Sequence, residues 1–156
     1  MKLSKILRNS FLVVLASLVL TACATKKVSN QTQGDVYTGK ETIKYLASGV
    51  KDRVFFATNE TVLTTASRET LRTQAAWLRK NSSINVVLEG HADERGTREY
   101  NLALGENRAL SVKEVLGLYN LEDRVVVVSY GEEQPVEIEH NEEAWEKNRR
   151  VEFVYY

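Results

Sequence analysis

INVVLEGHADERGTREYNLALGENRA, residues 84–109, is the stretch that decides the fold. Its first part alternates apolar and polar side chains, with Ile84, Val86 and Leu88 on one side, which is typical of a half-buried strand. A polar loop follows, and from Leu102 to Tyr119 apolar residues recur three and four positions apart, as they do on one face of a helix. The stretch therefore predicts a strand, an exposed polar loop and a long amphipathic helix.

The chain on either side of this stretch continues the alternation of strands and helices. We expect strands at 54–56, 125–130 and 151–156, and helices at 67–80 and 141–147. Thr64 or Thr65 can serve as the N-cap of the helix at 67–80. The order is strand–helix–strand–helix–strand–helix–strand, which predicts an α/β (α+β) two-layer sandwich with helices packed on a four-stranded sheet. The pattern alone leaves open which strands run parallel.

The N-terminus has the features of a targeting segment. Lys2, Lys5 and Arg8 precede an apolar stretch, 11–20, that is shorter than the roughly 20 residues needed to cross a bilayer. The stretch ends in Leu-Thr-Ala-Cys, which resembles the lipobox of bacterial lipoproteins. This resemblance implies that a signal peptide, residues 1–22, is removed and that Cys23 is acylated. An ordinary secretory signal with a chance cysteine is the alternative.

The segment after Cys23 is polar up to Lys40, so it buries too little to offset the entropy of ordering. We expect residues 23–40 to form the lipidated N-terminus and a flexible tether, and residues 41–156 to form one domain. Residues 42–51 place Ile43 and Ala47 at helical spacing, so a short turn can pack on this domain. Cys23 is the only cysteine in the chain, so no disulfide supports the fold. Ala24, following the same resemblance, implies sorting to the outer membrane with the domain facing the periplasm.

Charge argues against nucleic acid as a partner. The chain has 21 basic and 21 acidic residues, and the three basic residues before Cys23 have no acidic counterpart there. The remainder is therefore slightly acidic, whereas binding to phosphate backbones needs a surplus of Lys and Arg.

The string GHADERGT, residues 90–97, carries the most specific signal, together with Tyr100-Asn101-Leu102 and Arg108-Ala109. These residues resemble the signature of OmpA-like domains, and the string itself is similar to that of the peptidoglycan-associated lipoproteins, the Pal family. The resemblance extends from about Arg53 to the C-terminus. It implies an OmpA-like fold with a mixed sheet and non-covalent binding to the diaminopimelate of peptidoglycan.

Diaminopimelate ends in an ammonium and a carboxylate on one carbon, so its recognition needs an anion and a cation close together. The resemblance assigns Asp93 to the ammonium and Arg108 to the carboxylate, which an Arg can meet with two parallel hydrogen bonds. Asn101 lies on the same helical face as Arg108, Thr97 can cap the helix, and Leu102 completes this part of the predicted site. An internal ion pair between Asp93 and Arg108 is the structural alternative.

The first strand departs from the family pattern. Ala57 and Asn59 stand where the family has acidic residues, which leaves Phe56 and Thr58 as predicted walls of the pocket. Arg149 matches a family arginine near the pocket mouth. Its alternative role is a strand-end charge paired with Glu152.

Two other functions remain as alternatives to wall binding. The first is an envelope enzyme that uses His91, Asp93 and Glu94, but no metal-ligand spacing or activated nucleophile supports it. We therefore expect no catalysis, metal or cofactor, and we interpret His91 as a structural residue hydrogen-bonded under the loop. The second is a lipoprotein that only binds proteins and has a vestigial pocket.

Residues 132–146 contain seven glutamates and no Lys or Arg. A solvated edge is the simpler interpretation, and a docking surface for a basic partner is the other. The Pal resemblance implies TolB and other Tol-Pal or OmpA-like envelope proteins as partners, and a role in outer-membrane constriction during cell division.

Overall fold

The computed structural model describes residues 50–156. The predicted signal peptide, the predicted acylation site at Cys23, the predicted tether and nearly all of the short segment at 42–51 lie outside these residues. No helix in the described part is long and apolar enough to cross a membrane.

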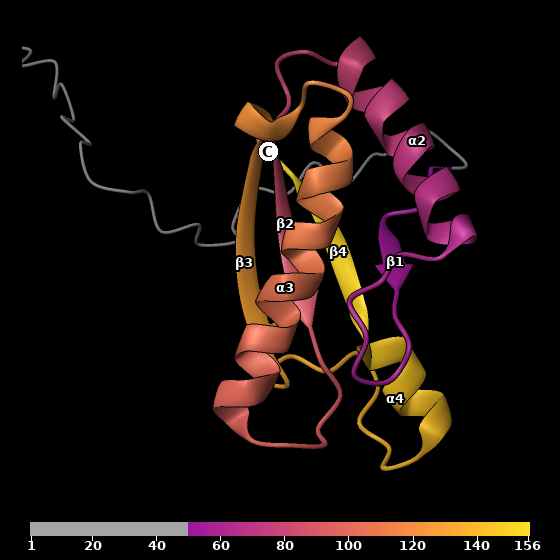
Figure 1. Cartoon of the computed structure of the whole chain (residues 1–156), viewed down its shortest axis with the longest axis vertical. Helices are drawn as coiled ribbons and strands as arrows, with labels where there is room; N and C mark the ends of the chain where they lie inside the picture. Colours follow the sequence, from indigo (N-terminus) through magenta and orange to yellow (C-terminus); the bar gives the residue numbers. More distant parts are fainter. Residues whose placement is uncertain (1–49) are drawn as a thin grey trace, which may run out of the picture. The chain divides into compact units, whose positions relative to one another are not determined.

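Strands and helices alternate in the described part as the sequence predicts (Figure 1). The four strands are β1 (Arg53–Phe55), β2 (Val86–His91), β3 (Val125–Gly131) and β4 (Arg150–Tyr155). The helices are α2 (Thr65–Lys80), α3 (Arg98–Gly117) and α4 (Glu142–Asn148), with a 3-10 turn, η1 (Glu122–Arg124), before β3. The expected elements are confirmed, with ends that differ by a few residues; the largest difference is that α3 begins at Arg98 rather than at Leu102.

Side-chain oxygens fix where each helix begins. Thr64 caps α2 by accepting a hydrogen bond from the Ser67 N–H at 3.1 Å, which settles the choice between Thr64 and Thr65. Thr97 caps α3 in the same way through the Tyr100 N–H, at 3.2 Å. An N-cap of this kind supplies an acceptor to a helix-end N–H group that has no partner within the helix.

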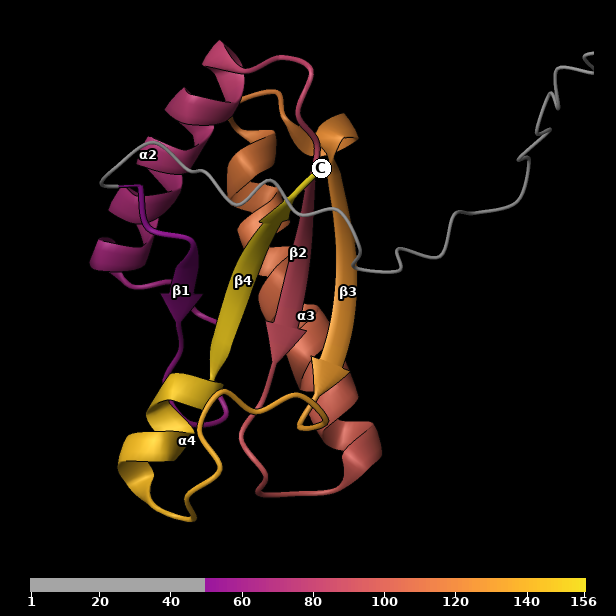
Figure 2. The ribbon, with the colours of Figure 1, turned by 180° about the vertical axis from the view of Figure 1, so that it is seen from behind.

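The sheet is mixed, with strand order β1-β4-β2-β3. β2 and β3 run parallel, and α3 makes the crossover between them. β4 runs antiparallel to both β1 and β2, so the last strand of the chain lies inside the sheet. Figure 1 shows α3 in front of the strands with α2 beside it, and Figure 2, from behind, shows the strands in front of α3. The described domain is therefore the two-layer sandwich that the sequence predicts.

The core lies between the helices and one face of the sheet. Val86 and Leu88 of β2, which the alternation placed on one side, are both fully buried there. They pack in one cluster with apolar side chains from the other elements, among them Leu71, Ala75, Leu78, Ala109, Val112, Leu116, Val151 and Phe153.

Two glycines bring α3 directly onto the sheet. A Cβ atom on Gly90 of β2 would lie 1.9 Å from the carbonyl oxygen of Gly105 in α3. A Cβ atom on Gly105 would lie 2.4 Å from the Ser129 hydroxyl of β3. Only glycine permits this approach, which fixes the height of α3 above β2 and so the course of the loop that joins them, residues 92–97.

That loop lies at the same end of the domain as the loop after β1 and the helix α4, as Figure 1 shows. β1 and β2 both end there, and α3 begins there. Segments from residues 57–60, 92–97 and 142–149 are thus brought together, and this is where the predicted site residues gather.

Candidate ligand-binding site

Asp93 stands at the centre of the site, with a side chain that is only 7% exposed. Arg95 grips its carboxylate from two residues away, with Nε 3.0 Å from Oδ1 and Nη2 2.8 Å from Oδ2. Arg149 donates from Nη1 to Oδ2 at 3.2 Å. Burial raises the pKa of Asp93, but the hydrogen bonds from Arg95 and Arg149 outweigh it and leave the pKa below its usual value. The carboxylate is therefore a buried anion with two cations of its own.

Arg149 joins Asp93 to two other segments. Its side chain is 4% exposed, and it donates from Nε to the Phe56 carbonyl at 3.1 Å and from Nη2 to Glu142 Oε1 at 2.9 Å. The alternative in which Arg149 pairs with Glu152 is wrong, because it is the neighbouring Arg150 that contacts Glu152, at 2.7 Å. Arg149 is thus part of the site.

Arg108 is fully buried, and its observed partners are main-chain carbonyls. It donates from Nε to Glu60, from Nη1 to His91 and from Nη2 to Ala57, at 3.0, 2.8 and 3.1 Å. Burial lowers the pKa of Arg108 to about 10, while the charge of Asp93 acts in the opposite direction. Its guanidinium lies over the Phe56 ring, 5.4 Å from the centroid. The direct Asp93–Arg108 ion pair considered as an alternative is not formed here. Arg108 instead ties the loops after β1 and β2 to α3.

A pocket of about 400 Å³ opens beside Asp93. Three predicted residues line it: Asp93, Thr58 and Asn101. Five further lining residues were not predicted, namely Asn59, Arg95, Gly96, Tyr100 and Leu104. Arg95 and Gly96 belong to the quoted GHADERGT string, and Tyr100 to the matched segment after it, so a signal for them was present but was not read as a site.

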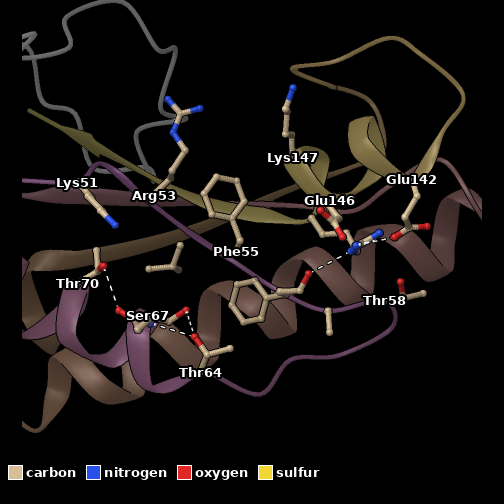
Figure 3. Close-up of a pocket in the computed structure, with 15 residues that line it drawn as sticks. Lys51, Arg53, Phe55, Thr58, Thr64, Ser67, Thr70, Glu142, Glu146 and Lys147 are labelled. Atoms are coloured by element: carbon tan, nitrogen blue, oxygen red, sulfur yellow. Dashed lines mark hydrogen bonds and ion pairs between the residues drawn. The ribbon is translucent and has the colours of Figure 1, made fainter.

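A second, larger groove of about 710 Å³ adjoins the first pocket at Thr58 (Figure 3). Phe56 and Arg149 line this groove instead of the smaller pocket, and its walls come from β1, the start of α2, and α4.

Thr97 acts as the helix cap, and Leu102 lines neither hollow. The backbone of Leu102 packs on β3 instead, where its carbonyl accepts a hydrogen bond from Ser129 at 2.6 Å. Of the predicted residues, Arg108, Thr97 and Leu102 therefore line neither of these two hollows.

Asn101 is also buried, and its amide nitrogen donates to Glu132. Several other glutamates of the acidic segment at 132–146 contact cations of the domain itself. Glu133 pairs with Arg98 at 2.6 Å and Glu137 with Lys147 at 3.1 Å, and Glu142 contacts Arg149 as described above. Part of this segment therefore encloses the site rather than forming a uniformly solvated edge.

His91 is structural, as expected, but not in the expected way. Neither ring nitrogen has a hydrogen-bond partner within the part of the chain that the structure describes. The ring stacks on Tyr130, with centroids 5.6 Å apart. Burial lowers the pKa of His91 to about 3, so the ring is neutral at neutral pH. Between residues 50 and 156 no cluster of His, Cys, Asp and Glu is arranged to hold a metal ion.

Comparison with known proteins identifies relatives of the chain. The model of the OmpA family matches residues 55–149. A peptidoglycan-associated lipoprotein of Agrobacterium fabrum is 36% identical over 157 residues, covering 96% of this chain and 89% of the relative. One from Pseudomonas aeruginosa is 55% identical over 74 residues, covering 47% of this chain and 44% of the relative.

Solved structures agree with these sequence matches. The peptidoglycan-associated lipoprotein of Burkholderia pseudomallei superposes with a TM-score of 0.66 at 36% identity, covering 68% of this chain and 91% of that one. The C-terminal domain of Helicobacter pylori MotB gives a TM-score of 0.63 at 22% identity, covering 68% and 84% of the two chains. The second likeness concerns the fold alone.

Proposed function

Because the chain belongs to the OmpA family and, within it, to the peptidoglycan-associated lipoproteins, we propose that its domain binds peptidoglycan non-covalently through diaminopimelate. The observation that carries the proposal is the buried, ionised Asp93 at the wall of a pocket, with arginines beside it. A zwitterion with its two charges on one carbon needs this combination of one anion and nearby cations.

In this proposal Asp93 accepts the ligand ammonium. The ligand carboxylate is attracted by the positive charges of Arg149 and Arg108. Three of the five N–H groups of Arg108 donate to carbonyls, so two remain for other acceptors. Thr58 and Asn101 line the pocket and can hydrogen-bond the ligand. The groove that adjoins at Thr58 gives the rest of the stem peptide a place to lie.

The rival function, an envelope enzyme, would need a general base near Asp93. His91 is the one histidine in the loop string, yet its ring is buried against Tyr130 and cannot reach a substrate in the pocket. Glu94 is occupied by His140 and by the Trp145 indole N–H, the latter at 2.8 Å. These contacts favour binding without catalysis.

At its other end the chain is held by lipid. Acylation of Cys23 with more than one chain anchors a protein stably, whereas a single chain binds a membrane marginally. The protein then links the outer membrane to the wall, with its domain in the periplasm. Following its relatives, it acts in the Tol-Pal system with TolB and supports envelope integrity and constriction in division. In Cys23→Ser, labelled palmitate is lost and the protein is released from membranes; palmitate on this variant would place the anchor elsewhere.

Co-sedimentation with purified sacculi tests wall binding directly. The parent protein is expected to sediment with sacculi and to release no soluble fragments from them. Asp93→Asn removes the anion with little change of shape and is expected to stay in the supernatant. Glu99→Gln, an exposed site on the first turn of α3, is the matched control and sediments like the parent. Fragment release would support the enzyme, and absence of sedimentation by the parent would support the lipoprotein that binds only proteins.

A further inference from the structure

Arg95 occupies the place at Asp93 that the proposed ligand would need. Its guanidinium contacts both carboxylate oxygens, and its own backbone N–H donates to Oδ1 at 3.2 Å. With Arg149 on Oδ2 as well, the carboxylate has two cations as partners in this structure. An ammonium ion cannot approach Asp93 closely while both of these contacts remain.

The two arginines differ in how firmly they are held. Arg149 is 4% exposed and is bonded to a buried carbonyl, so its release would leave buried groups without partners. Arg95 is 38% exposed and lines the pocket. Its contacts other than Asp93 are at the surface: Nη2 lies 3.3 Å from the Thr58 hydroxyl and Nη1 lies 3.5 Å from Glu142. Arg95 is therefore the arginine that can leave at small cost.

A resting place for the released side chain is also present. The Arg95 guanidinium carbon lies 4.2 Å from the centroid of the Trp145 ring, a cation–π contact. Glu142, on the same helix, carries a carboxylate within reach. The side chain can move off Asp93 while it keeps these two contacts, and the charge that leaves Asp93 is replaced by the charge of the incoming ammonium.

We infer that Arg95 is a built-in competitor for the ammonium of the ligand, and that it thereby raises the binding energy that the other contacts of a ligand must supply. This inference rests on the proposed function. A ligand that brings only an ammonium exchanges a two-point ion pair for a single contact and gains little. A ligand that also brings a carboxylate gains bonds to the remaining arginines, which offsets the loss of Arg95. Competition of this kind lowers the affinity of every ligand by the same factor, the fraction of molecules with Arg95 displaced.

Calorimetry on Arg95→Ala tests the inference, because it predicts a gain where an ordinary contact residue would give a loss. The ligands are two tripeptides, one with diaminopimelate and one with lysine at the third position. We expect Arg95→Ala to bind both roughly two- to fivefold more tightly than the parent, as for the loss of one partly exposed ion pair. The lysine peptide, which binds the parent weakly, should become easier to detect.

Arg98→Ala is the matched control, since it removes the same charge near the loop but from an exposed pair with Glu133. It is expected to bind like the parent. A second readout does not depend on affinity: the Arg95 Nε–H signal in the NMR spectrum should exchange faster with water once the diaminopimelate peptide is added.

The outcomes separate the two proposals. If the parent binds and Arg95→Ala binds equally or more weakly, or if the peptide leaves the Nε–H signal unchanged, Arg95 is not a competitor and wall binding still stands. If neither protein binds the diaminopimelate peptide, the proposed function fails and the inference falls with it.

Discussion

Arg108 and Arg95 approach one site in opposite ways. Arg108 is fully buried in α3 and bonded to three carbonyls, two in the loop after β1 and one at the end of β2, whereas Arg95 is partly exposed and bonded to the buried Asp93 carboxylate. The first holds the loops in place, and the second covers the anion that those loops present. Arg108 is thus an internal support of the site, and Arg95 lies at its edge. The same residue type serves both roles because the Arg108 guanidinium is desolvated and the Arg95 guanidinium is not.

The largest effect on stability should come from removing the Arg108 side chain. Arg108→Ala leaves three carbonyls without their donor, and we expect the free energy of unfolding to fall by about 2–4 kcal/mol, measured by urea denaturation. Arg108→Lys keeps the charge but loses the planar fork, so it should recover only a minor part of the loss. Full recovery by lysine would show that charge, and not the three directed bonds, holds the loops.

The second largest effect is expected at the close contact between Gly90 of β2 and Gly105 of α3. Gly90→Ala places a methyl group against the Gly105 backbone, which cannot move aside as a flexible side chain can, and should cost about 1–3 kcal/mol of unfolding free energy. Gly117→Ala, at the other end of α3, is the control, because its Cβ would meet only the movable Glu122 side chain at 3.0 Å. Equal thermal stability of these two variants would contradict the account of how α3 is seated.

Asp93 is ion-paired with Arg95 and Arg149, and its ionisation should make the stability of the fold depend on pH. Folding lowers the pKa of Asp93, so the stabilisation it provides is present above its usual value of 3.8 and is lost as the pH falls through the lower folded value. The parent should therefore be more stable than Asp93→Asn at pH 7, and the difference should shrink as the pH falls below about 4. Thermal melts from pH 7 to pH 2 measure this; a constant difference would mean that the ion pairs do not stabilise the fold.

The smallest effect, on the affinity for the diaminopimelate peptide, is expected from changing Trp145, which contacts Arg95. Trp145→Leu removes a ring that Arg95 contacts while it pairs with Asp93 and, in our proposal, still contacts after displacement. The loss affects both states, so the affinity for the diaminopimelate peptide should change by less than about twofold. Trp145→Phe keeps a ring there and should match the parent in the same titration. Binding weakened beyond this range in the leucine variant would indicate that Trp145 contacts the ligand.

Periodicity was sufficient to predict the helices because the buried residues of α2 and α3 recur three and four positions apart. The expectation of a half-buried strand was wrong for β2, because Val87 on its other face is buried as well. Strand directions were not predictable, since β4 inserts between β1 and β2 through pairings between distant residues such as Arg53 with Glu152. The family string predicted Asp93 and Asn101, and the match of the first strand predicted Thr58; all three line the pocket. Neither match indicated that the Leu102 carbonyl bonds to Ser129 of β3.

Arg108 and Arg95 show why the sequence alone could not predict the contacts within this site. Arg108 shares a helical face with Asn101, which indicated the direction of its side chain but not its complete burial or its three bonds to main-chain carbonyls. The contact of Arg95 with Asp93 depends on how the loop turns between β2 and α3, and that turn is set by the seating of α3 on Gly90. His91 was expected to hydrogen-bond, yet its ring stacks on Tyr130 and its ring nitrogens have no partner among the described residues.

Isothermal titration of the protein with the diaminopimelate tripeptide, for the parent and for Asp93→Asn, tests the central claim most directly. The account predicts one-site binding with measurable heat for the parent, weaker binding when lysine replaces diaminopimelate, and no detectable binding for Asp93→Asn. Equal affinity of the parent and Asp93→Asn for the diaminopimelate peptide would contradict it, because the ligand would then be held without the anion around which the site is built.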